Sequence, residues 1–213
     1  MRHNAACEII AAAVGKGSKG RWRLLQNFGR QDGAPEERTV PEWMLPTEVR
    51  GSDPLDDKPD FVMIEGLGRH APDPRGPIAY ARVGQDDQVD AGGNRRDTSV
   101  KLTICEVKYA DDVRMRTKHA QARAKYDGDA KLTGKLTQAG WRVEGLHTIV
   151  VGHRATVSVS NRQAFAGLGI TKAKEQDALQ EKLAESAAWW ARKIVNHTRK
   201  YRAEHPGGAT PPT

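Results

Sequence analysis

Runs of apolar residues at strand and helix spacing divide the chain into a series of elements. Residues 4–14 place apolar side chains on one side of a helix that Gly15 is expected to end. Residues 21–28, 60–64 and 99–109 are rich in β-forming residues and predict strands. Residues 113–139 predict one or two helices interrupted by Gly128 and Gly134, and residues 141–151 predict a further core strand. The pattern therefore indicates a mixed α/β chain.

The remaining segments complete this order with a short strand, two helices and two stretches of loop composition. The short strand passes through Val157 and Val159, and residues 162–168 predict a short helix. Residues 171–203 predict a long amphipathic helix with a buried stripe, formed by Leu179, Leu183, Ala187, Trp190, Ile194 and Tyr201. We expect one domain over residues 1–203 with a long loop at 66–98, and a disordered tail at 204–213.

Composition limits the cellular environment and the kinds of binding partner that we expect for this chain. The formal net charge of +7 favours an acidic partner such as nucleic acid, but charge alone does not separate DNA, RNA and an anionic membrane surface. No apolar run approaches the length needed to cross a bilayer, and the N-terminus lacks the pattern of a secretory leader. The two cysteines, Cys7 and Cys105, suggest neither a disulfide framework nor a zinc site. We therefore expect an intracellular protein, nuclear or cytoplasmic.

Two short strings carry the candidate chemistry. Asp60 follows Lys58 and Pro59 at the start of one predicted strand, and Glu106 and Lys108 stand near the end of another. Strand side chains alternate between faces, so Glu106 and Lys108 project from the same face. If the two strands pair, two carboxylates and one ammonium meet at one edge of a sheet. Mg²⁺ or Mn²⁺ prefers oxygen ligands, and such a group suits phosphodiester hydrolysis.

Each of these residues also has an ordinary structural interpretation. Asp60 is suited to capping the turn after Pro59, and Glu106 to an exposed strand end. A lysine such as Lys108 is common on edge strands, where it discourages pairing with other chains.

The spacing of Pro59-Asp60 and Glu106-Val107-Lys108 resembles the PD-(D/E)XK nuclease superfamily. The resemblance implies a restriction-endonuclease-like fold, a mixed central β-sheet flanked by helices. It also implies that Asp60, Glu106 and the carbonyl of Val107 bind Mg²⁺ or Mn²⁺. Lys108 would then orient or deprotonate the attacking water, or stabilise developing negative charge. Glu8 is a candidate extra ligand from the first helix, with a solvated glutamate as the alternative.

The helix after the motif is the predicted contact with substrate. RecB-type members of the superfamily carry Gln and Tyr four residues apart there, whereas Gln121 and Tyr126 are five apart, so Gln121 alone is predicted to bond the attacking water or a phosphate. Five basic residues predict phosphate contacts, with a solvated helix face as the alternative: Arg114, Arg116, Lys118, Arg123 and Lys125. For Trp189 and Trp190, core packing competes with base stacking.

A closer resemblance covers residues 58–67, 106–109 and 146–152, which are similar to endonuclease-like domains attached to reverse transcriptases of non-LTR retroelements. It implies nicking of a DNA strand to leave a 3′-hydroxyl. No polymerase motif is present, so we expect a detached or truncated domain, or a host gene descended from one.

The resulting hypothesis is an Mg²⁺-dependent DNA endonuclease. A catalytically inactive nucleic-acid-binding module of the same fold and an α/β interaction domain are the alternatives. The expected partner is DNA, with no membrane and no small organic cofactor, and a homodimer is left open.

Overall fold

The computed structural model describes residues 2–18, 22–26, 40, 44–45, 49, 58–65, 101–139 and 141–205. The predicted loop at 66–98 lies outside the described residues, as does most of the predicted tail at 204–213, whose first residue, Glu204, is instead the last residue of a helix. The elements in chain order are α1 (Arg2–Ser18), β1 (Trp22–Gln26), β2 (Phe61–Glu65), β3 (Lys101–Ala110), the 3₁₀ turn η1 (Asp112–Arg114), α4 (Met115–Tyr126), α5 (Leu132–Gln138), β4 (Arg142–Gly152), α6 (Asn161–Gly167) and α7 (Ala173–Glu204).

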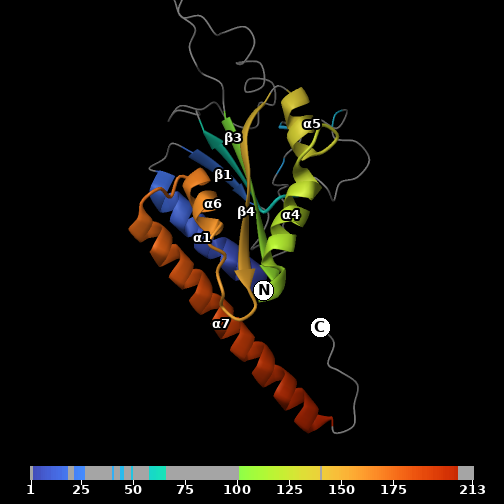
Figure 1. The fold of residues 1–213 in the computed structure, drawn as a ribbon, viewed down its shortest axis with the longest axis vertical. Helices are drawn as coiled ribbons and strands as arrows, with labels where there is room; N and C mark the ends of the chain where they lie inside the picture. Colours follow the sequence, from blue (N-terminus) through green and yellow to red (C-terminus); the bar gives the residue numbers. More distant parts are fainter. Residues whose placement is uncertain are drawn as a thin grey trace, which may run out of the picture.

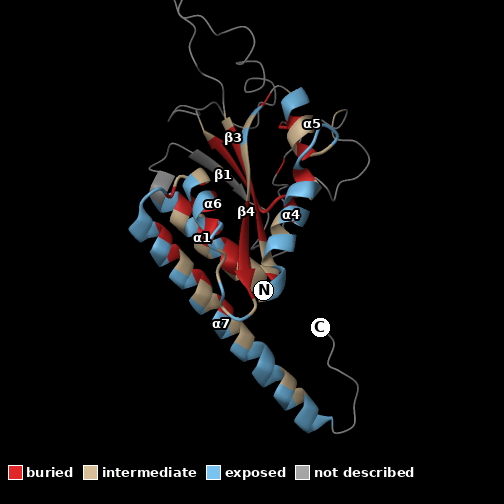
Figure 2. Cartoon of the chain, viewed as in Figure 1, coloured by how far each residue is buried: buried red, intermediate tan, exposed pale blue. Residues whose placement is uncertain are grey.

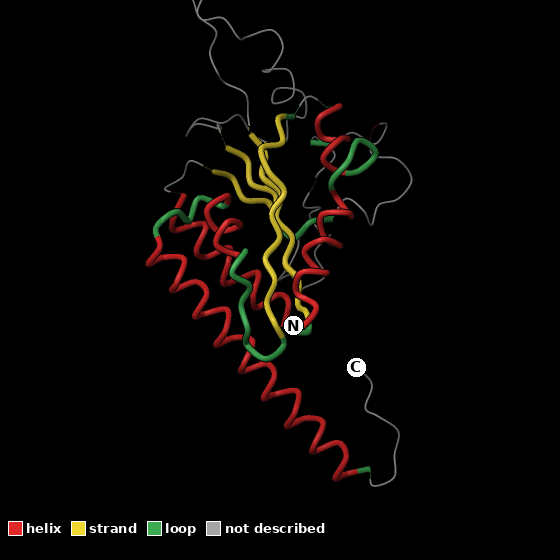
Figure 3. Tube along the Cα trace, viewed as in Figure 1, coloured by secondary structure: helices red, strands yellow, loops and turns green. Residues whose placement is uncertain are grey.

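The strands form one mixed sheet in the order β1-β2-β3-β4 (Figure 1). β1 pairs antiparallel with β2, and β2 pairs antiparallel with β3. β3 and β4 pair in parallel, because the chain crosses between them through α4 and α5. The expected mixed α/β architecture is confirmed: helices lie on both sides of the strands (Figure 3).

Apolar side chains fill both sides of the sheet, as the alternation along β3 requires. Cys105 and Val107 belong to a core shared with α1, α6 and α7. Leu102 and Ile104 belong to a second core shared with α4 and α5. Figure 2 shows β3 and the second half of β4 buried between these two helical layers. The sheet is therefore covered on both faces, and polar groups near its strands are drawn into a largely water-excluded interior.

Glycine positions explain two differences from the predicted helices. α1 does not end at Gly15 but continues to Ser18. A glycine inside a helix costs only about 1 kcal/mol relative to alanine, so it need not end one. Residues 113–139 do form two helices, and the break falls at Gly128, whose φ of +139° is a conformation that favours glycine. Gly134 lies inside α5, where an added Cβ would approach the backbone oxygen of Asp129 to 2.1 Å.

The predicted strand through Val157 and Val159 does not form in the described part of the chain. One isolated bridge joins Val151 to Val157, and Val159 is 82% exposed. The outer side of β4 is bonded partly by the backbone of Thr156 and Ser158 and partly by a side chain. Asn161, at the start of α6, accepts a hydrogen bond from the Val150 N–H at 3.0 Å and donates one to the Val150 carbonyl at 2.9 Å. A buried amide thus replaces a strand partner at this point.

The long helix was predicted with a buried stripe, and this prediction is wrong for its second half. Leu179, Leu183 and Ala187 are buried, whereas Ile194 is 48% exposed. Figure 2 shows the first half of α7 against the other helices and the second half extending away from them, largely exposed. The apolar spacing continues past the point at which the rest of the described chain covers the helix.

Candidate functional site

The candidate site lies where β3 continues beyond the start of β2. The antiparallel pairing of these strands begins with Phe61 opposite Cys105. Among the described residues, positions 106–110 of β3 pair with β4 alone, which leaves their other edge open. Asp60, directly before β2, occupies this edge, and its Oδ2 accepts a hydrogen bond from the Val107 N–H at 2.7 Å. The side chain of Asp60 thus takes the place of a strand partner.

Asp60 and Glu106 are brought together at this edge. The backbone N–H of Asp60 donates a hydrogen bond to Glu106 Oε2 at 3.3 Å. Both residues are buried, with exposed fractions of 8% for Asp60 and 3% for Glu106. The alternative interpretation of Glu106 as an exposed strand end is therefore wrong. A buried carboxylate such as that of Glu106, which also feels the charge of Asp60, is unfavourable unless protons or cations compensate it.

Lys108 provides one compensating charge. Its Nζ forms a salt bridge with Glu106 Oε1, as the two-residue spacing on a strand allows. Burial raises the pKa of the Glu106 carboxyl, and the charge of Asp60 raises it further, while Lys108 lowers it. The direction of the total shift is upward, so the Glu106 carboxylate is not fully compensated by its protein neighbours.

Tyr126, which the sequence analysis left out of the site, contacts Glu106 directly. Its hydroxyl lies 3.1 Å from Glu106 Oε2 and 3.0 Å from the carbonyl oxygen of Lys58, and it accepts a hydrogen bond from Lys125 Nζ at 2.9 Å. The ring is fully buried. Tyr126 therefore ties α4 to the residue before Pro59 and to the acid of β3.

Gln121 does not share this position. It lies on an exposed side of α4, where Lys118 Nζ donates a hydrogen bond to its amide oxygen at 3.0 Å. Ala122 and Tyr126 are the buried residues of α4. They are four residues apart and so share one face of the helix, whereas Gln121 lies on another, and this spacing was the available sequence signal. The predicted bond of Gln121 to the attacking water or to a phosphate therefore stays a prediction, made from an exposed position outside the Asp60–Glu106 group.

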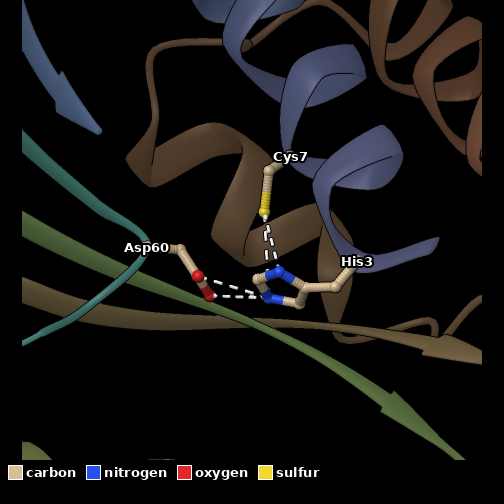
Figure 4. Close-up of side chains that lie close together, drawn as sticks. All are labelled: His3, Cys7 and Asp60. Carbon is tan, nitrogen blue, oxygen red and sulfur yellow. Dashed lines mark hydrogen bonds and ion pairs between the residues drawn. The ribbon is translucent and has the colours of Figure 1, made fainter. Parts of the chain in front are cut away.

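His3 is the second residue that sequence reasoning missed. Figure 4 shows its ring directed from α1 toward Asp60. His3 Nε2 lies 3.2 Å from each carboxylate oxygen of Asp60 and 3.2 Å from the carbonyl oxygen of Val107. The hydrogen bond to Asp60 raises the pKa of His3 despite partial burial. When protonated, His3 therefore places a positive charge beside the Asp60 carboxylate and the Val107 carbonyl, the oxygens predicted to bind a metal ion.

Cys7 stands one helical turn after His3 and completes a group of metal-ligand side chains. Its Sγ lies 3.8 Å from His3 Nδ1. One ligand atom each from His3, Cys7 and Asp60 lies within 4.8 Å of the other two. Burial raises the pKa of the Cys7 thiol strongly. Because the thiolate is the form that binds metals, this shift favours His3 and Asp60 over Cys7 as ligands. A histidine and a cysteine four residues apart in the first helix were the available sequence signal.

Glu8 and the cations of α4 lie outside this group. Glu8 is exposed and follows Cys7 on α1, about 100° further around the helix. Of the five basic residues assigned to substrate, Arg114, Arg116 and Arg123 are exposed, and the other two are half-buried. Arg123 forms an ion pair with Asp127 at 3.3 Å. These positions suit surface contacts with an anion, and they equally suit a solvated helix face.

Comparisons with protein-family models, with curated proteins and with solved structures gave no match for this chain. Within the described residues, the helices are too short or too polar to span a bilayer.

Proposed function

We propose that this chain is a metal-dependent DNA endonuclease with a restriction-endonuclease-like fold of the PD-(D/E)XK type. The observation that carries the proposal is the meeting of Asp60 and Glu106 at an open strand edge, with Lys108 on Glu106. The mixed sheet, with α1 on one face and α4 on the other, supports the same fold. The likeness to endonuclease domains of retroelements belongs to this proposal too.

The donor types at the site suit a divalent cation, and among the described residues the side chains close enough to share one are His3, Cys7 and Asp60. Asp60 and Glu106 supply carboxylate oxygens, Val107 a carbonyl oxygen and His3 a ring nitrogen. Oxygen donors suit both Mg²⁺ and Mn²⁺, while a neutral imidazole suits Mn²⁺ better than Mg²⁺. A cation bound there would polarise a phosphodiester and lower the pKa of a bound water. Because His3 must lose its proton to bind a metal, we expect affinity to rise with pH through the raised pKa of His3.

The protein residues have separate tasks in this proposal. Lys108 stands beside the carboxylates, where an ammonium can orient the attacking water or stabilise charge that develops on the phosphate. Tyr126 fixes the rotamer of Glu106 through its hydroxyl, without contact with the reacting atoms. Val107 presents its carbonyl because the β3 edge has no strand partner there in the described chain.

The test is cleavage of supercoiled plasmid DNA in Mg²⁺ or Mn²⁺. We expect wild-type protein to convert the plasmid to the nicked form, and Asp60→Asn and Lys108→Met to abolish this conversion. The matched controls are Asp177→Asn and Lys182→Met, two changes on exposed positions of α7. Nicking that survives Asp60→Asn, or that needs no divalent metal, would falsify the proposal.

One observation favours a second candidate, a nucleic-acid-binding module without cleavage activity. The carboxylate oxygens of the site already contact protein groups: His3 and the Val107 N–H contact Asp60, while Lys108, Tyr126 and the Asp60 N–H contact Glu106. This module would bind DNA with strong salt dependence. Its binding would be unchanged by Glu106→Gln, and it would cleave in no divalent metal.

A further inference from the structure

The second half of α7 extends beyond the domain. Leu183 and Ala187 are the last buried residues of the helix, and Trp189, Ile194 and Val195 are each about half exposed, at 49%, 48% and 47%. We call residues 188–204 the distal α7 segment. At 1.5 Å per residue it is about 25 Å long. Figure 1 shows it running past the N-terminal end of α1 and away from the sheet.

The charge of α7 changes sign where the helix leaves the domain. Residues 173–187 carry two basic and four acidic residues, a net charge of −2. The distal α7 segment has five basic residues against one acid, Glu204, a net charge of +4. These basic residues are Arg192, Lys193, Arg199, Lys200 and Arg202, and all five are exposed. Over half of the chain's net charge of +7 thus lies on this one segment.

The distal α7 segment begins at the end of the molecule that holds the candidate site. The first turns of α1, with His3 and Cys7, lie at this end, and Cys7 shares a core with Ala187. Arg2 and Asp111 both contact His153, at 3.2 Å each, which ties the start of α1 to the segment leading into the basic helix α4. The basic helix α4 and the distal α7 segment therefore both begin near this end of the molecule (Figure 1).

We infer that the distal α7 segment binds the phosphate backbone of duplex DNA beside the stretch that enters the site. The identity of the partner rests on the proposed function, and the contact itself rests on the charge and exposure of this segment. Phosphates repeat every 3.4 Å along a strand, so a segment about 25 Å long runs beside roughly seven of them. Trp189 adds an aromatic surface among the cations, with Lys193 Nζ 4.5 Å from its ring centroid.

The experiment measures DNA affinity without cleavage. A fluorescent 30-bp duplex is titrated in EDTA with full-length protein at several salt concentrations. The test variant is Lys193→Gln with Lys200→Gln. The control variant is Lys174→Gln with Lys182→Gln, which removes the same charge from exposed positions in the covered half of the same helix. Both variants keep the carboxylates and His3, and urea unfolding confirms that each one folds.

If both lysines contact phosphates, the slope of log K against log salt becomes shallower by about 2 in the test variant, because each lost contact removes about 0.9. The control should keep the wild-type slope. Equal changes in the two variants, or no change in either, overturn the inference while DNA remains the partner. Absence of wild-type binding to the duplex at low salt overturns the partner as well. The inference also fails if the segment binds phosphatidylserine vesicles or a second copy of the chain instead of DNA.

Discussion

Removal of the Tyr126 hydroxyl tests the polar network that holds the candidate site together. Tyr126→Phe preserves the buried ring, so it opens no cavity in the core. It does remove a hydrogen bond to a buried carboxylate, Glu106, and the contact with the Lys58 carbonyl. A hydrogen bond to a charged group contributes about 1.5–3 kcal/mol, and we expect a loss near 2 kcal/mol.

The measurement is urea unfolding in EDTA, followed by tryptophan fluorescence. At an unchanged m-value, the free energy of unfolding should fall by about 2 kcal/mol and the melting temperature by about 4–8 °C. Tyr109→Phe is the matched control, because the Tyr109 hydroxyl is buried without a hydrogen-bond partner in the described structure. Its removal should leave stability unchanged or slightly higher. If Tyr126→Phe costs no more than Tyr109→Phe, the hydroxyl does not hold Glu106.

Three further predictions concern other parts of the same framework. Asn161→Ala should destabilise the protein by about 2 kcal/mol in urea unfolding, because the buried Val150 N–H loses its partner and the Val150 carbonyl keeps only the longer bond from the Ser158 N–H. Asn196→Ala, at an exposed position of α7, should cost little. Asp60 raises the pKa of His3 in the folded protein, so protonated His3 stabilises the fold. In EDTA this stabilisation is complete below pH 6.5 and disappears as the pH rises through the pKa of His3 in the folded protein. Urea unfolding midpoints should show this loss in wild type and not in His3→Gln. His3→Asp should lower the ratio of Mn²⁺-supported to Mg²⁺-supported nicking, because an oxygen replaces an imidazole donor; an unchanged ratio would place His3 outside the metal site.

Much of the fold was predictable from local pattern. The two strands around Asp60 and Glu106 follow from β-forming runs, and the two-residue step to Lys108 fixes a shared face, while their pairing is seen only in the structure. Gly128 follows the end of α4 in a backbone conformation that favours glycine, in line with the break predicted there. Gly134 carries the same sequence signal but lies inside a helix, where the close approach of the Asp129 backbone leaves no room for a Cβ.

The parts of the site that sequence missed depend on long-range packing. His3 reaches Asp60 only because α1 packs against the β3 face that carries Val107. Tyr126 reaches Glu106 because α4 packs on the other face of the sheet. The residue spacing that pointed to Gln121 does not show which side of α4 faces the sheet. The exposed second half of α7 is a similar case: its apolar spacing is regular, but the rest of the described chain does not extend far enough to cover it.

Metal binding tests the central claim most directly, and electron paramagnetic resonance of Mn²⁺ measures it without DNA. Wild-type protein at pH 8 should bind a single Mn²⁺ per chain, seen as loss of the free-ion signal. Asp60→Asn should abolish this binding, and His3→Gln should remove nitrogen coupling from the spectrum of the bound ion. An undiminished free-ion signal with wild-type protein, or equal binding by Asp60→Asn, would contradict the account.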